Sequence, residues 1–95
     1  DAVVRRVEAR DGRLDALVHA VGDYTSGALE ELDAAGLSAL VASNVTTAWC
    51  TWRAARASLR ARGGRVVFFG TAGLDGLRAK RQAAGYAAAK SALLV

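Results

Sequence analysis

The chain has 95 residues, of which 53% are hydrophobic and 23% charged, enough apolar surface for folding to offset its entropy cost. One cysteine excludes an internal disulfide, and one histidine beside it argues against a zinc site. No apolar run reaches the length of a membrane span, and no signal peptide is evident. We therefore expect a folded cytoplasmic protein without a membrane partner or a bound metal.

The net charge of +4 hides a split along the chain. Residues 1–33 carry eight acidic and four basic side chains, whereas residues 34–95 carry nine basic side chains and one acidic, Asp75. A basic segment suggests an anionic partner such as nucleic acid or a phosphorylated cofactor, but a solvated arginine-rich helix end is the favoured explanation. Because the chain has neither interleaved aromatic residues nor an RNA-binding or zinc-finger signature, we expect no nucleic-acid partner.

The pattern of apolar residues predicts five elements. Residues 2–10 have helical spacing and end at Asp11-Gly12, and the apolar run 14–21 is typical of a parallel strand buried on both faces. A polar turn follows Gly22. Residues 28–62 have helical periodicity up to Gly63-Gly64, and residues 65–70 form a second buried strand. A loop with Gly73, Asp75 and Gly76 then leads to a helix that begins near residues 83–86.

This order is a βαβ unit with flanking helices, because parallel strands require a crossover connection. Two strands with open edges make a poor sheet, so we expect an α/β protein and part of a doubly wound parallel sheet. The chain begins without methionine and ends inside the apolar run 91–95 with no helix cap. We interpret it as an internal fragment of a longer protein.

Tyr86 and Lys90 are four residues apart, so they share one face of the last predicted helix. The three alanines between them leave room for a flat ligand, and a phenol beside an ammonium can exchange protons. The alternative is a helix on which Tyr86 packs and Lys90 is solvated.

Two other polar residues stand at informative positions. Thr71 follows the second strand, at the sheet edge where α/β proteins bind ligands, although a turn or cap hydroxyl is an equal alternative. Asn44 lies on the apolar stripe of the long helix. A buried amide needs hydrogen-bond partners, so Asn44 marks either a helix irregularity or a polar site.

Taken in order, these motifs resemble those of the short-chain dehydrogenase/reductase family. They are Leu17-Val18-His19-Ala20-Val21-Gly22, a helix with Asn44, the run from Gly64 to Thr71, and Tyr86-x-x-x-Lys90. The resemblance covers essentially the whole chain. It implies a Rossmann-type fold with seven parallel strands, of which this chain would hold the fourth and fifth. Residues 1–95 would then be a partial NAD(P)-binding domain without the N-terminal glycine-rich half and the C-terminal part.

The resemblance also implies roles for the four candidate catalytic residues. Tyr86 matches the acid/base that exchanges a proton with the substrate oxygen during hydride transfer. Lys90 matches the lysine that favours the phenolate and binds the nicotinamide ribose. Asn44 matches the asparagine that holds a water in the proton relay. Thr71 stands where the family usually has a serine that polarises the carbonyl, and its hydroxyl can donate an equivalent hydrogen bond.

The family's Asn-Asn-Ala-Gly motif is replaced here by His19-Ala20-Val21-Gly22, so both amide side chains are absent. The resemblance places Ala20, Val21 and Gly22 at the cofactor, NADP or NAD, and we interpret His19 as structural. It implies a small carbonyl or alcohol substrate and a homo-oligomer through the helices that carry Asn44 and Tyr86. A catalytically silent relative that acts as a binding or regulatory module is the alternative.

Overall fold

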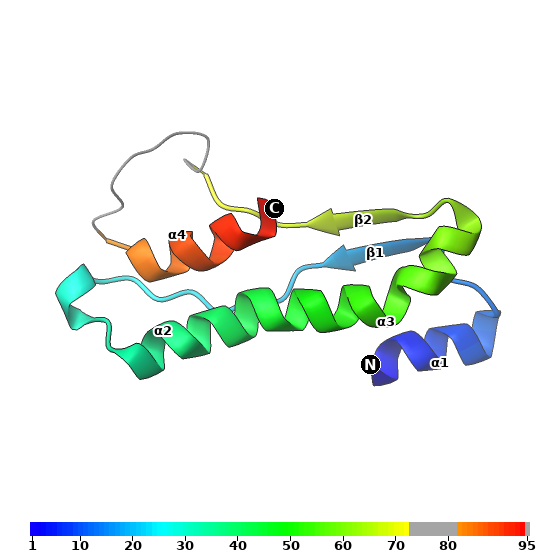
Figure 1. Ribbon diagram of the computed structural model, residues 1–95, viewed down its shortest axis with the longest axis horizontal. Coiled ribbons are helices and arrows are strands. Elements are labelled where there is room, and N and C mark those ends of the chain that lie inside the picture. The colour runs from blue at the N-terminus through cyan, green and yellow to red at the C-terminus, as the bar shows by residue number, and fades with distance from the viewer. Residues whose placement is uncertain (73–81, 95) are drawn as a thin grey trace. The chain divides into compact units, whose positions relative to one another are not determined.

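A computed structural model of the chain describes residues 1–72 and 82–94 (Figure 1). The chain divides into two compact units. The first unit comprises residues 1–20 and 48–68, and the second comprises residues 21–47 and 69–95. The expected loop with Gly73, Asp75 and Gly76 lies outside the described residues. No helix in the described part of the chain is long and apolar enough to cross a membrane.

In the first unit, β1 (Ala16–His19) and β2 (Arg65–Phe68) lie side by side as a parallel pair (Figure 1). The register places Val18 opposite Val67. The parallel pairing confirms the predicted βαβ unit, although both strands are shorter than expected. Val18 is 59% and Val67 45% exposed, so the described residues alone do not bury the pair on both faces. Among the described residues, the face that carries Leu17 and His19 is covered and the opposite face is open.

The first helix, α1 (Ala2–Asp11), matches the helix predicted over residues 2–10. It begins at Asp1, whose carboxylate accepts hydrogen bonds from the backbone N–H groups of Val3 and Val4. It ends at Gly12, which adopts the left-handed conformation and donates its N–H to the carbonyl of Glu8. Both ends of this helix are therefore fixed by residue type.

The core of the first unit lies where α1 meets α3 (Thr47–Arg62). Val4, Ala55 and Leu59 are buried there, and Leu14, Leu17 and Ala54 pack against them. The chain then turns at Gly63 and Gly64, as predicted. A Cβ on Gly64 would lie 2.7 Å from the backbone oxygen of Asp15, so only glycine permits the helix end to approach β1 this closely.

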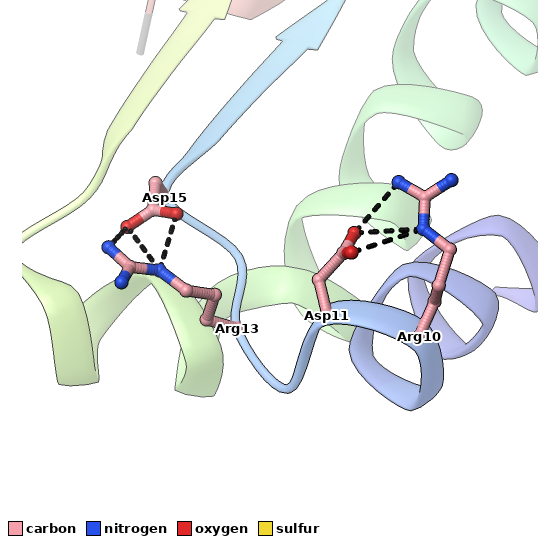
Figure 2. A network of polar contacts seen from close by, with 4 residues as sticks. All are labelled: Arg10, Asp11, Arg13 and Asp15. Carbon is pink, nitrogen blue, oxygen red and sulfur yellow. Dashed lines mark hydrogen bonds and ion pairs between the residues drawn. The ribbon is translucent and has the colours of Figure 1, made fainter.

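Two exposed ion pairs border the connection from α1 to β1 (Figure 2). Arg10 pairs with Asp11 at 2.8 Å, and Arg13 pairs with Asp15 at 2.5 Å. The hydrogen bond from the Arg13 guanidinium lowers the pKa of the Asp15 carboxyl and in turn raises the pKa of Arg13. Because both pairs are exposed to water, they contribute little to stability.

In the second unit a 3₁₀ turn (Leu29–Glu31) precedes α2 (Ala34–Val41). A π-helical turn, η2 (Ala42–Thr46), follows α2 directly, and α3 follows η2. The prediction of one regular helix over residues 28–62 is therefore wrong in two respects, because the helix begins at Ala34 and the π-helical turn interrupts it. The helix begins later because Asp33 adopts an extended conformation, and its carboxylate accepts a hydrogen bond from Gly36 N–H at 2.7 Å.

The last helix, α4 (Ala84–Ser91), begins where predicted and continues into a 3₁₀ turn, Ala92–Leu94. It packs against α2 within the second unit (Figure 1). A Cβ on Gly85 would lie 2.4 Å from Cδ2 of Leu32 and 3.1 Å from Cδ1 of Leu40. The missing side chain at Gly85 thus allows α4 to lie close to these leucines.

Leu59→Ala in the intact protein is expected to lower the free energy of unfolding by about 2–4 kcal/mol, because it leaves a cavity beside Val4 and Ala55. The matched control is Val3→Ala on α1, where the side chain is 69% exposed and the expected change is below about 0.5 kcal/mol. Urea unfolding of both variants measures the difference. Equal losses would show that this cluster is not the core of the unit.

Candidate functional site

The π-helical turn η2 carries Asn44, which is fully buried (0% exposed). The N–H of Thr47 donates to the carbonyl of Ala42, five residues earlier, as in a π-helix. The hydroxyl of Thr47 also donates to the carbonyl of Ser43 at 2.6 Å. Of the two interpretations left open for Asn44, the helix irregularity is therefore confirmed, and the amide sits inside it.

Asn44 and its neighbour Ser43 hold one residue of the loop after β1, Asp23. Nδ2 of Asn44 donates to the carbonyl of Asp23 at 3.0 Å and to the carbonyl of Leu40 at 3.0 Å. Oγ of Ser43 accepts a hydrogen bond from the N–H of Asp23 at 3.1 Å. Asp23 is thus bound at both of its backbone polar groups, and this fixes the loop to the π turn. We call Asp23, Ser43 and Asn44 together the Asp23 clamp.

The other atom of the Asn44 amide, Oδ1, is buried and has no hydrogen-bond partner among residues 1–72 and 82–94. It faces Gly22, where a Cβ would lie 2.1 Å from Oδ1 and 3.4 Å from Nζ of Lys90. Both atoms therefore lie close to one point beside Gly22. The sequence did not predict that the space at Gly22 is taken by these two side chains.

Lys90 is buried, with 6% of its surface exposed, on the face of α4 that also carries Tyr86. Its ammonium lies 5.8 Å from the centroid of the Tyr86 ring, a distance typical of a cation–π contact. Within the described parts of the chain it makes no hydrogen bond or ion pair. The alternative of a solvated lysine is therefore wrong. Of the intervening alanines, Ala87 and Ala89 are buried, so only Ala88 lies open.

A second tyrosine contacts Tyr86. The ring of Tyr24 meets the ring of Tyr86 edge to face, with centroids 4.9 Å apart and planes at 81°. In the sequence, Tyr24 stands out only as one residue of the polar turn after Gly22. Its position two residues after Gly22 and one after the clamped Asp23 was the available signal, but the contact with Tyr86 depends on the three-dimensional fold.

The remaining candidate residues lie on other segments, in the coil after β2 and at the end of β1. Thr71 is half-buried in the coil after β2 in the second unit, and its hydroxyl makes no hydrogen bond to a described residue. Val21 is 56% exposed, and Ala20 is exposed in the first unit. His19 is buried in β1, where its ring meets the ring of Phe68 at 6.0 Å.

The second unit thus places an ammonium, an unpaired amide oxygen and a half-buried phenol close together. The first two can bind hydroxyl groups or water, since one donates and the other accepts. The phenol can exchange a proton. No group of three or more metal-ligating side chains occurs among the residues the structure describes.

Gly22→Ala is expected to lower the free energy of unfolding of the intact protein by about 1–3 kcal/mol, because the new methyl group displaces the Asn44 amide from its hydrogen bonds. Gly70→Ala is the matched control, since a Cβ there meets no atom within 4 Å. Thermal unfolding of the two variants measures the effect. Equal stability of both would contradict the close packing of Asn44 and Lys90 at Gly22.

Comparison with protein families gives one match that covers the whole chain. Residues 1–95 match the family described as enoyl-(acyl carrier protein) reductase. Comparison with curated protein sequences gives no match.

Several solved structures are similar to the chain. A short-chain dehydrogenase from Burkholderia cenocepacia J2315, in complex with NADP, is 32% identical with a TM-score of 0.85 over 98% of this chain and 37% of its own. A 3-oxoacyl-(acyl-carrier-protein) reductase from Agrobacterium tumefaciens C58, with NADP bound, is 29% identical with a TM-score of 0.82 over 96% of this chain and 34% of its own.

A short-chain dehydrogenase from Streptomyces avermitilis is 32% identical, with a TM-score of 0.84 over 97% of this chain and 34% of its own. The chain therefore spans little more than a third of the length of each of these three structures.

Proposed function

The chain belongs to the short-chain dehydrogenase/reductase family, and on that premise we propose that the intact protein transfers hydride between a nicotinamide cofactor and a carbonyl or alcohol substrate. The resemblance inferred from the sequence is thus confirmed, together with the partial Rossmann-type α/β fold. The observation that carries the proposal is the buried ammonium of Lys90 beside the ring of Tyr86 and the unpaired oxygen of Asn44.

The residues present fit a nicotinamide nucleotide. A ribose hydroxyl both donates and accepts hydrogen bonds, and the Lys90 ammonium has no acidic partner among the described residues to compete for it. Gly22 has no side chain that would block Lys90, and Val21 is exposed on the same loop. We propose that Lys90 and Tyr86, with the backbone of residues 20–22, hold the nicotinamide end of NADP or NAD. When bound, this cofactor supplies or accepts the hydride.

Tyr86 is the proposed acid/base. Its phenol gives a proton to the substrate oxygen in reduction and takes it back in oxidation. The charge of Lys90, 5.8 Å from the ring centroid, stabilises the negative charge that develops on the phenol oxygen. A water between Oδ1 of Asn44 and the ammonium would satisfy both atoms and connect Lys90 to a proton source. Thr71 is proposed to donate its hydroxyl proton in a hydrogen bond to the carbonyl oxygen.

We further propose a homo-oligomer that forms through the helices carrying Asn44 and Tyr86. On α3, which follows the Asn44 turn, Trp49 is 57% exposed and its ring lies 5.2 Å from that of Trp52. Two adjoining tryptophans on a surface favour a protein contact, because such rings bury large apolar area at low entropy cost.

Tyr86→Phe in the intact protein is expected to lower kcat at least tenfold, corresponding to about 1.4 kcal/mol, while the affinity for the cofactor changes little. Only the exchangeable proton is lost, and the ring contacts with Tyr24 and Lys90 stay. Steady-state kinetics with simple ketones and NADPH or NADH measures kcat, and calorimetry measures cofactor affinity.

A Phe variant that kept more than about a tenth of the wild-type kcat would remove Tyr86 from the acid/base role. A wild-type protein that binds the cofactor and turns over no carbonyl or alcohol would instead favour the catalytically silent alternative. The two measurements therefore separate a wrong residue from a wrong reaction.

Two variants of Thr71 test the size of its side chain and its hydroxyl group separately. Thr71→Ser keeps the hydroxyl and is expected to retain kcat/KM within about threefold, whereas Thr71→Ala is expected to lose tenfold or more, because a hydrogen bond to developing charge is removed. Comparable kcat/KM for the Ala variant and the wild type would exclude Thr71 from the site.

A further inference from the structure

The proposed reaction leaves one large side chain at the site without a role. Tyr24 is 62% exposed, yet its ring lies 4.9 Å from that of Tyr86. An edge-to-face contact stabilises such a pair. That contact uses only part of the ring, so most of the Tyr24 surface remains open beside the phenol that is proposed to meet the substrate.

Tyr24 lies on a loop whose backbone is held by hydrogen bonds. It follows Asp23, whose N–H and carbonyl are bound by Ser43 and by the fully buried Asn44. The peptide before Tyr24 is therefore fixed to the same π turn that carries Asn44. An aromatic side chain with few rotatable bonds on a fixed backbone offers a flat surface at a defined position, at low entropy cost to a ligand that binds it.

Apart from its phenol hydroxyl, the open part of the Tyr24 side chain is apolar. Lys90 is buried, with its ammonium 5.8 Å from the centroid of the Tyr86 ring, and the clamp uses only the backbone of Asp23. A flat aromatic ring stacks on or meets edge-on a second flat ring better than it contacts a bulky saturated group of equal size. The surface therefore selects for planar groups.

Building on the proposed function, we propose that Tyr24 is a specificity-determining residue that holds a planar aromatic group of the substrate next to the carbonyl carbon. The substrate class is then an aryl ketone or the corresponding aryl carbinol. Tyr24 contacts the substrate and takes no part in proton transfer, so its ring is needed and its hydroxyl is not.

The test compares two ketones of similar size, acetophenone and cyclohexyl methyl ketone, with the intact wild-type protein, Tyr24→Phe and Tyr24→Ala. Tyr24→Ala is expected to lower kcat/KM for acetophenone at least tenfold and to change that for cyclohexyl methyl ketone less than about threefold. Tyr24→Phe is expected to keep both values within about threefold, because it keeps the ring. Thermal unfolding confirms that the variants fold.

Equal losses for the two ketones in Tyr24→Ala would overturn the proposal, since they would show that Tyr24 only supports the position of Tyr86. No loss for either ketone would overturn it as well. If the wild type reduces neither ketone, Tyr24 is judged by equilibrium binding of acetophenone instead. A Kd for acetophenone that rises tenfold in Tyr24→Ala alone supports the aromatic surface, and absent or unchanged binding overturns it.

Discussion

The second unit depends on the amide of Asn44. This side chain is fully buried, and its Nδ2 joins the carbonyl of Leu40 on its own helix to the carbonyl of Asp23 in a loop twenty-one residues away. Buried polar groups that find partners specify one arrangement, because every alternative leaves them unsatisfied. The loop positions of Gly22 and Tyr24 follow from this connection, and with them the surroundings of Tyr86 and Lys90.

The π turn explains how a helix can accept such a residue. An asparagine in the interior of a regular helix competes with the backbone for hydrogen bonds. In η2 the extra residue interrupts the regular hydrogen-bond pattern of the α-helix, so that the N–H of Thr47 donates to the carbonyl of Ala42, five residues earlier. The hydroxyl of Thr47 donates a hydrogen bond to the carbonyl of Ser43. Single π turns occur often at functional sites. The apolar core of Val4, Ala55 and Leu59 lies in the first unit, whereas the buried polar residues Asn44 and Lys90 lie in the second.

Much of this could be predicted from residue types. The helix ends at Gly12 and Gly63-Gly64 were predicted, as was the start of α4 at Ala84. The parallel pairing of β1 with β2 was predicted as well. These features follow from helix caps and apolar runs, which act locally. The long helix was predicted to start too early, because the periodicity of residues 28–33 outweighed the capping signal of Asp33. The sequence suggested that Asn44 was unusual without deciding how. Its contact with Asp23, the space at Gly22 and the Tyr24 ring depend on long-range packing, which local patterns do not encode.

Beside Gly22 the fold brings together a hydrogen-bond acceptor and a hydrogen-bond donor that have no hydrogen-bond partner among the described residues. Oδ1 of Asn44 is a buried acceptor without a partner, and a group of this kind costs about 1–3 kcal/mol. The Lys90 ammonium beside it is a donor in a side chain that is only 6% exposed. A direct pairing of the two would close the site, whereas a hydroxyl or water placed between them satisfies both. Under the proposed function, a ligand hydroxyl that accepts from Lys90 and donates to Oδ1 of Asn44 would couple stability and binding through the same two atoms.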